Sequence, residues 1–401
     1  ARILLAFSVT FLVPGIWAWF EDHHDLQWIW LAGFGLTAAS GLLMGALTQR
    51  YHRELRAKDG FVLVNMVWLV LPAYSALPLM FLVPDISWFK AYFEAMSALT
   101  ATGATALSGL DHLPVSVNIW RCFLQLIGGL GIMLLVVAVL PLLGLGGLQL
   151  YKAETPGPMK DTKFTPRIAE TARGLWGVYF LFSGACFLAY RWAGMSWADA
   201  FMHMCTTMGL GGFSSYDASL GHFNSPAVEW VAVVFMALAG ISFMRYFIVL
   251  RNRSLRPLTS DREIRTYFGV LLGSIAVIAV LLAAHNVYDS FPEALRASAF
   301  HVVSLATTTG YSATDYSLWP VFAPVLLLFL GSFVSCAGST GGGIKMVRMI
   351  LLIKQARREL VRIIHPRVVN PVTLGGVVLP PSVMNATFGF MLIYGAVTMG
   401  L

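Results

Sequence analysis

Charge is scarce in this sequence. Asp, Glu, Lys and Arg make up only 12% of the 401 residues, whereas 57% are hydrophobic and the mean hydropathy is +0.72. A soluble globular domain carries roughly 25% charged residues. The composition therefore excludes a soluble domain and places most of the chain in lipid.

Cysteine is also scarce, and its spacing carries little information. The four residues Cys122, Cys186, Cys205 and Cys336 are scattered, and no two of them form a CxxC pair. A disulfide framework would need paired cysteines in an outward-facing loop. We therefore predict that all four are buried structural thiols.

Long apolar runs dominate the rest of the chain. A membrane-spanning helix needs about 20 apolar residues. Suitable runs cover residues 28–47, 61–83, 119–143, 175–193, 227–250, 267–284, 321–334 with 346–353, and 383–401. Ala1 and Leu401 both stand inside apolar runs, so we expect further residues beyond each end. The chain is predicted to cross the membrane many times.

The basic residues indicate how these runs are oriented. Most of the 27 Lys and Arg residues stand in polar segments 49–60, 151–173, 251–265 and 354–367. Because positively charged loops stay in the cytoplasm, these segments are predicted to face inward and the others outward. The formal net charge of +7 therefore reflects membrane topology, and we predict no nucleic-acid partner.

Three outward-facing segments, residues 91–111, 200–217 and 298–315, resemble one another. Each combines a helix-like stretch that is too short to span with a turn rich in Gly, Thr and Ser. Aligning their central glycines, Gly103, Gly212 and Gly310, also pairs the histidines of the last two segments, so one unit repeats about every hundred residues. Each unit starts and ends inside, so the copies should be parallel and ring an axis along the membrane normal, unlike inverted repeats.

These turns indicate a shared water-filled pore. Irregular backbone at membrane depth is tolerated only where protein buries it or water lines it. Glycine reaches φ > 0 and can turn successive carbonyls to one side, and rings of carbonyls replace the hydration shell of a permeating cation. Close helix packing would explain one such turn, but three aligned turns favour a cation pore. His203 and His301 occupy equivalent places in different repeats, which favours a structural or outer-mouth role over a metal pair.

Four motifs carry a family resemblance: TATGAT, GLGGFSSYDAS, TTTGYSATDYSLWP and CAGSTGGGIK. They resemble the Trk/Ktr/HKT superfamily of potassium transporters, and its bacterial TrkH branch most. The resemblance extends over essentially the whole chain. It implies an all-α integral membrane fold, with a pseudo-fourfold repeat of helix, re-entrant pore helix with filter loop, and helix, preceded by two extra amino-terminal helices.

The resemblance also assigns residues to a potassium selectivity filter. The implied positions are Ala101, Thr102 and Gly103, then Leu210, Gly211 and Gly212, then Thr308, Thr309 and Gly310. Glycine at position 103, in place of the serine of sodium-favouring relatives, implies a preference for potassium. The family's fourth filter and its outgoing helix would follow Leu401.

The family implies a function and partners as well. We expect potassium uptake across the bacterial inner membrane by a homodimer embedded in lipid, with the basic loops in the cytoplasm. Potassium would be the only bound ion, and a nucleotide, ATP, ADP or NAD, would bind only to a cytosolic TrkA-like regulatory ring. The expected parts are two amino-terminal helices at 1–58, pore repeats at 59–152, 153–258 and 259–368, and the start of a fourth repeat at 369–401.

A second glycine-rich stretch interrupts the third outgoing run. Residues 335–345 read SCAGSTGGGIK, and the predicted gate consists of Gly338, Gly341, Gly342, Gly343 and Lys345. Each interior glycine disfavours a helix by about 1 kcal/mol, and a broken helix within the membrane needs a cavity beside it. The stretch resembles the family's intramembrane gating loop.

The basic residues after the glycines have open interpretations. Lys345 and Arg348 should face the protein interior or extend inward. Residues 355–367 could be a regulator dock, an anionic-lipid contact or an ordinary positive-inside segment.

Two other classes of function have less support. An ion-coupled symporter driven by H+ or Na+, or a secondary transporter of another class, needs intramembrane carboxylates. The one candidate is Glu94 in the first short helix. An enzyme needs convergent nucleophiles, acids or metal ligands, yet the His and acidic residues stand largely in loops and not at ligand spacing. We therefore predict no catalytic residue and no transition-metal site, and the symporter stays as the alternative.

Overall fold

The computed structural model describes residues 1–20, 24–49, 57–138, 164–374 and 377–400. These residues form helices and connecting loops, apart from one short pair of antiparallel strands. The predicted all-α architecture is confirmed for this part of the chain. Most of the basic segment 49–60 and the first part of segment 151–173 lie outside the described residues.

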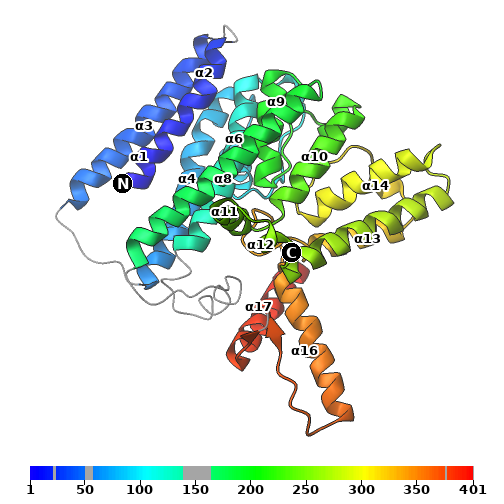
Figure 1. The fold of residues 1–401 in the computed structure, drawn as a ribbon. Helices are drawn as coiled ribbons and strands as arrows, with labels where there is room; N and C mark the ends of the chain where they lie inside the picture. The colour runs from blue at the N-terminus through cyan, green and yellow to red at the C-terminus, as the bar shows by residue number, and fades with distance from the viewer. Residues whose placement is uncertain (21–23, 50–56, 139–163, 375–376, 401) are drawn as a thin grey trace. The chain divides into compact units, whose positions relative to one another are not determined.

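Figure 1 shows the helices, with most of them labelled in chain order. The first half contains α1 (Arg2–Ser8), α2 (Leu12–Phe20), α3 (His24–Thr48), α4 (Ala57–Leu82), α5 (Trp88–Leu99), α6 (Val115–Ala138), α8 (Phe164–Trp192) and α9 (Trp197–Gly209). The second half contains α10 (Pro226–Ala239), α11 (Phe243–Asn252), α12 (Arg256–Thr259), α13 (Arg262–Ala284), α14 (Phe291–Ala306), α15 (Phe322–Gly331), α16 (Met346–Ile364) and α17 (Pro381–Gly400). Short 3-10 helices are η1 (Val9–Phe11), η2 (Leu110–His112), η4 (Ser219–Phe223) and η5 (Tyr316–Leu318), and the strands are β1 (Thr373–Leu374) and β2 (Val377–Val378).

Seven helical stretches among the described residues are long and apolar enough to cross a membrane. They are Arg2–Phe20, Asp25–Thr48, Val62–Leu82, Val115–Met133, Glu170–Trp192, Arg262–Ala284 and Pro381–Gly400. The first combines α1, η1 and α2. Together with α3 it supplies the two amino-terminal spans that the family resemblance implied.

The apolar run predicted at 227–250 meets the length and hydropathy requirements of a span only as two helices with a break between them. α10 and α11 are separate helices that are bent by 83° relative to each other. At the break, the Tyr267 hydroxyl occupies the place that a Cβ at Gly240 would need. Glycine and serine pairs are common at helix kinks, and Ser242 follows Gly240 closely. The signal for the bend was therefore present, but the apolar length of the run outweighed it.

α5, α9 and α14 are the short helices predicted for the three repeats. They contain 12, 13 and 16 residues, fewer than the roughly 20 that a span requires. α5 and α9 each begin after a serine, Ser87 or Ser196, whose hydroxyl accepts a backbone hydrogen bond at 3.4 or 3.0 Å. Such a cap marks a helix start. A glycine turn and a 3-10 helix follow each short helix, so the repeat recurs in the structure.

The chain divides into two compact units. The first comprises Ala1–Gly131, Phe182–Phe235 and Thr309–Thr314. The second comprises Ile132–Leu181, Met236–Thr308 and Asp315–Leu401.

All four cysteines are buried and free, as predicted.

An aromatic cluster stabilises the first unit. The Trp120 ring of α6 lies 4.5 Å from the Phe11 ring and 5.6 Å from the Trp30 ring, measured between centroids. Its Nε1 donates to the Ser75 carbonyl at 3.0 Å. Aromatic pairs contribute about 0.5–1.5 kcal/mol beyond the area that they bury. The cluster therefore fixes the amino-terminal helices against α6, the helix that carries several residues of the site.

α13 organises the second unit. Its Tyr267 hydroxyl donates to the Ala237 carbonyl at 2.9 Å. Asp261, the residue before α13, accepts a hydrogen bond from Glu263 N at 2.7 Å and forms an ion pair of 2.6 Å with Arg245 of α11. A capping aspartate satisfies a free amide of the first turn. Asp261 therefore both begins α13 and joins it to α11.

Candidate functional site

The three predicted filter segments share one backbone conformation. In each, a residue with left-handed backbone stands two positions before the central glycine. The first residues are Ala101 (φ 53°), Leu210 (φ 52°) and Thr308 (φ 64°), and the glycines are Gly103 (φ 78°), Gly212 (φ 72°) and Gly310 (φ 84°). Left-handed backbone costs a residue other than glycine roughly 1–2 kcal/mol. Because three equivalent residues adopt this unfavourable conformation, contacts with neighbouring groups must stabilise the turn.

Hydrogen bonds at the ends of the short helices produce this turn. After α5, Ala101 N donates to the Ala98 carbonyl at 3.1 Å, and Thr102 N donates to the Ser97 carbonyl at 2.9 Å. The same pair of bonds recurs after α9. This is the Schellman pattern, in which a left-handed residue ends a helix and satisfies its last carbonyls. The first two segments thus begin as helix caps, and the third has the equivalent first bond, from Thr308 N to the Leu305 carbonyl at 3.0 Å.

The three segments approach one another closely in the first unit. A Cβ added to Gly103 would overlap the carbonyl oxygen of Gly211, and one added to Gly212 would overlap that of Thr309. Neighbouring backbone and a positive φ therefore both exclude a side chain at these two glycines. A Cβ at Gly310 would meet no heavy atom within 4 Å. All predicted filter residues except Thr308 belong to this unit.

Tyr311 fixes the third segment against α9. Its buried hydroxyl contacts the hydroxyl groups of Thr206 and Thr207 and donates to the His203 carbonyl at 3.2 Å. Sequence alignment of the repeats pairs Tyr311 with Phe213, whose ring has no hydroxyl. The contact was therefore not predictable from the repeat.

The two aligned histidines are both fully buried. Nδ1 of His203 lies 2.8 Å from the Asp199 carbonyl oxygen, and Nδ1 of His301 lies 2.9 Å from that of Ala297, one turn earlier in each helix. His203 also reaches Ser214 Oγ at 3.0 Å. Within the described ranges, no group of three or more His, Cys, Asp or Glu is placed to hold a metal ion. The equivalent bonds support a structural role.

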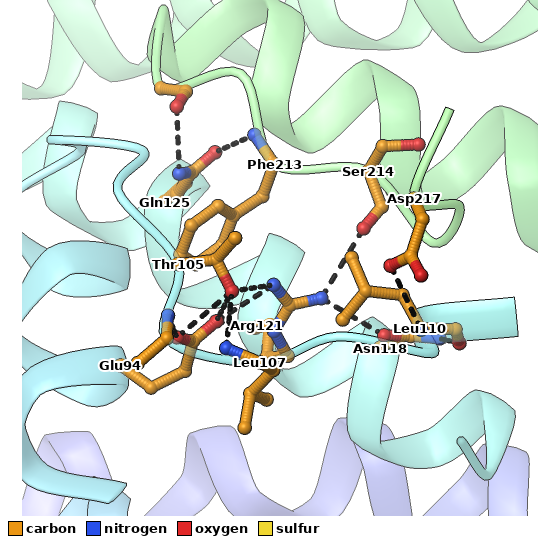
Figure 2. Close-up of polar contacts among 12 residues, drawn as sticks. Glu94, Thr105, Leu107, Leu110, Asn118, Arg121, Gln125, Phe213, Ser214 and Asp217 are labelled. Carbon is orange, nitrogen blue, oxygen red and sulfur yellow. Dashed lines mark hydrogen bonds and ion pairs between the residues drawn. The ribbon is translucent and has the colours of Figure 1, made fainter. Parts of the chain in front are cut away.

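The aligned aspartates Asp217 and Asp315 have different partners. Asp217 accepts hydrogen bonds from Gly109 N at 2.7 Å and Leu110 N at 3.1 Å, and so joins the loops that follow the first two segments (Figure 2). Asp315 accepts from the hydroxyl and the backbone N of Ser317 at 2.6 and 3.0 Å. These bonds lower the pKa of Asp315 below its ordinary value. The loops therefore depart from the symmetry of the repeat.

A buried ion pair lies beside the first segment (Figure 2). Arg121 of α6 and Glu94 of α5 are 1% and 0% exposed, with Nη2 and Oε1 2.7 Å apart. Glu94 also accepts hydrogen bonds from the Thr105 hydroxyl at 2.9 Å and from Ala106 N at 3.0 Å. A buried ion pair is tolerated when further hydrogen bonds satisfy both partners. Glu94, the candidate coupling carboxylate of the sequence, is thus occupied by a structural network.

Arg121 and Gln125 extend this network to the second segment. Arg121 Nη1 donates to the Ser214 carbonyl at 3.2 Å, and its guanidinium lies 4.5 Å from the Phe213 ring centroid. One turn further along α6, Gln125 Nε2 donates to the Gly211 carbonyl at 3.0 Å, and its Oε1 accepts from Phe213 N at 3.2 Å. Sequence reasoning missed both residues. For Arg121 the available signal was a charged side chain inside an apolar run, which usually marks a functional or paired group.

The predicted interruption of the third outgoing helix is present. α15 ends at Gly331 and α16 begins at Met346. The segment between them, residues 332–345, is called the glycine loop below. It folds back on itself, because Ile344 N donates to the Ser332 carbonyl at 2.7 Å and the Ser335 hydroxyl donates to the Gly342 carbonyl at 2.6 Å.

Two side chains hold the glycine loop from outside. The Thr308 hydroxyl accepts a hydrogen bond from Gly342 N at 2.7 Å. The Glu263 carboxylate of α13 accepts from Ala337 N of the loop at 2.9 Å and from Val347 N in the first turn of α16 at 3.1 Å. Charge-assisted bonds of this kind are stronger than neutral ones. Glu263 therefore joins the loop to the start of α16.

The kink between α10 and α11 also contacts the glycine loop. The Gly240 carbonyl accepts a hydrogen bond from Cys336 N at 3.0 Å, and Phe243 N donates to the Gly338 carbonyl at 3.2 Å. The helix break of the second repeat thus satisfies backbone groups of the break in the third. Backbone groups at each break thus find in the other break the hydrogen-bond partners that a continuous helix would have provided.

The two basic residues after the glycines contact protein groups. Lys345 Nζ donates to the Gly341 carbonyl. Arg348 donates to the Ile344 carbonyl at 3.2 Å, and its guanidinium lies 4.1 Å from the Phe390 ring centroid of α17. All five predicted gate residues therefore lie in the glycine loop.

The TrkH family model, described as a cation transport protein, matches residues 27–401. The chain belongs to the TrkH family. It is 42% identical to the Trk system potassium uptake proteins TrkH of Salmonella typhimurium, over 397 residues, and of Vibrio parahaemolyticus, over 401 residues. Each comparison covers 98% of this chain and 82% of the relative. The crystal structure of the potassium transporter TrkH from Vibrio parahaemolyticus matches with a TM-score of 0.89 and 38% sequence identity, and covers 99% of this chain and 82% of that chain.

Membership of the TrkH family confirms the resemblance and the fold class. The relatives are named as transporters, and several helices of this chain are long enough to span a membrane. This TrkH-family chain is therefore a multi-pass membrane protein.

Proposed function

We propose that this TrkH-family chain takes up potassium across the bacterial inner membrane through a filter of backbone carbonyls. The observation that carries the proposal is the meeting of three segments with the same left-handed turn, each at the end of a short helix. Carbonyls presented in this way replace the hydration shell of a cation, and the carboxyl ends of the helices favour positive charge. The relatives at 42% identity are named potassium uptake proteins.

In this proposal the nine predicted positions, from Ala101 to Gly103, Leu210 to Gly212 and Thr308 to Gly310, line the ion path. Glycine at Gly103 and Gly212 lets adjacent segments close around the ion, because the carbonyl of the next segment fills the space of a side chain. Glycine at position 103 favours potassium.

The glycine loop is the proposed gate. Its Gly342 amide bonds to the hydroxyl of Thr308, the first residue of the third filter segment. Opening would break this bond and the contact between Lys345 and Gly341. The glycines at 338, 341, 342 and 343 permit the change in backbone conformation that opening requires.

Topology and partners complete the proposal. The basic segments face the cytoplasm, and residues 1–58, 59–152, 153–258, 259–368 and 369–401 form the amino-terminal helices and successive repeats. Two copies form a homodimer in lipid, and a cytosolic TrkA-like ring with bound nucleotide controls the gate. The carboxyl half of α16 and the segment after it support a dock for this ring, because Arg357 and Arg362 of the helix and Arg367 beyond it are exposed.

Cation uptake by the purified protein in liposomes tests the proposal. Electrogenic flux is measured with potassium, rubidium, sodium and lithium in turn, with protein-free liposomes as the control. We expect a membrane potential alone to drive uptake that favours potassium. Equal passage of sodium would make the potassium assignment wrong, and flux only with a pH gradient or another solute would support the symporter instead.

A further inference from the structure

We propose that Gln125 sets the ion discrimination of the filter by positioning the Gly211 carbonyl. The inference rests on the proposed potassium function and adds a residue that does not itself belong to the filter. Gln125 stands on α6, in the first repeat, whereas the carbonyl belongs to the second repeat. It is a positioning residue that acts through backbone.

The Gln125 amide binds the second segment at two points. Nε2 donates to the Gly211 carbonyl at 3.0 Å, and Oε1 accepts from Phe213 N at 3.2 Å (Figure 2). The side chain is 0% exposed, so water does not compete for these groups. Donor and acceptor of one planar amide thus fix the backbone on both sides of Gly212.

The Gly211 carbonyl is confined from two directions. A Cβ at Gly103 would overlap this oxygen, so the first segment lies directly against it. A Cβ at Gly211 would overlap the Gln125 amide, so no side chain fits between the amide and the segment. The oxygen is therefore fixed between the first segment and the amide donor.

Neighbouring contacts hold Gln125 itself in place. The backbone of α6 at Gln125 lies close to the end of α9, because a Cβ at Gly209 would come within 2.7 Å of the Gln125 carbonyl oxygen. One turn earlier, Arg121 packs against the Phe213 ring at 4.5 Å and bonds to the Ser214 carbonyl (Figure 2). The amide therefore approaches the segment from a rigid support.

A hydrogen bond to a filter carbonyl affects ion preference in two ways. It restrains the oxygen from moving toward a smaller ion, and it reduces the field that the oxygen presents to a cation. Discrimination between potassium and sodium depends on the size of the site and on the number and field strength of its carbonyls. Removing the Gln125 amide should therefore favour sodium relative to potassium.

The variant Gln125→Met tests this proposal, because methionine has a similar length and neither donor nor acceptor for the backbone. The ratio of potassium to sodium permeability is measured from reversal potentials of the reconstituted protein. We expect the ratio to fall about tenfold, which corresponds to about 1.4 kcal/mol, with an increase in absolute sodium flux. A protein that had only lost structure would lose both fluxes.

Phe123→Met is the matched control on the same helix. Phe123 is half-buried and its ring lies 6.1 Å from that of Phe201, away from the filter contacts, so the ratio should stay unchanged. If Gln125→Met does not fold, Gln125→Asn gives the same test, because its amide is too short to reach both backbone groups. A ratio within about twofold of wild type in a folded variant would overturn the proposal. Absence of potassium preference in the wild type would instead overturn the proposed function.

Discussion

At the scale of single residues, the glycines at the proposed filter positions are constrained by different features of their surroundings. Gly103 has a positive φ, and the carbonyl oxygen of Gly211 fills the space beside it. Gly310 also has a positive φ, but no atom of the described residues lies within 4 Å of the place that its Cβ would take. At either place, this backbone conformation would cost a residue with a side chain roughly 1–2 kcal/mol. Only at Gly103 would an added side chain also force a neighbouring segment to move.

This difference predicts unequal effects of the same substitution. We expect Gly103→Ser to abolish the preference for potassium over sodium and Gly310→Ser to weaken it less. Liposome flux with the two ions in competition measures both variants. Gly184→Ser is the control, because a Cβ at this α8 glycine meets nothing within 4 Å. Equal losses at Gly103 and Gly310 would show that φ alone, and not crowding, decides the effect.

Residue types predicted the filter turns but not the groups that support them. A left-handed turn has a signature in composition, since glycine recurs where φ is positive. Gln125 has no such signature. Its partner, the Gly211 carbonyl, lies 86 residues further along the chain, and only the packing of α6 against α9 brings the two together.

At the scale of elements, the buried ion pair between α5 and α6 predicts a stability effect. Arg121→Met leaves the Glu94 carboxylate buried without its cation, and breaking such a pair costs about 3–5 kcal/mol. Thermal unfolding in detergent should show a clear loss of stability. The double variant Glu94→Gln with Arg121→Met should recover most of it. Failure to recover would mean that Arg121 acts mainly through Phe213 and Ser214.

The glycine loop predicts an effect on gating. Replacing Gly341, Gly342 and Gly343 with alanine introduces a Cβ at Gly343 that would lie 2.6 Å from the Ser332 carbonyl oxygen, at a φ of 79°. The observed loop conformation then becomes unfavourable by about 1–2 kcal/mol or more. Single-channel recording should show a higher open probability, by about fivefold or more, with ion preference intact. Gly395→Ala on α17, where a Cβ meets nothing within 4 Å, is the control. Altered selectivity with normal gating would contradict the assignment.

Local patterns predicted the elements well where the cause was local. The break after Gly331 follows from several glycines in a few residues. The bend between α10 and α11 was missed, because its stability depends on tertiary bonds from Gly240 and Phe243 to the glycine loop. Hydropathy measures apolar length, and it contains no information about such partners.

At the scale of the whole molecule, the repeat was the most informative feature of the sequence. Alignment of the three segments predicted three short helices, each followed by an equivalent glycine turn, and the structure contains both. The asymmetric contacts were not predictable in this way. Asp217 joins two loops whereas its counterpart Asp315 bonds to Ser317 within its own loop. Each repeat has adapted its loop to a different neighbour.

The distance along the chain between the filter segments has a consequence for biosynthesis. A ribosome adds roughly 5–20 residues per second, so Gly103 emerges roughly 10–40 s before Gly310. Glu94 and Arg121 are only 27 residues apart and pair within the first repeat. The first repeat can therefore form its internal contacts in the membrane before the later repeats are synthesised. The proposed ion pathway would therefore form only late in synthesis, when the last segment docks against repeats that are already inserted.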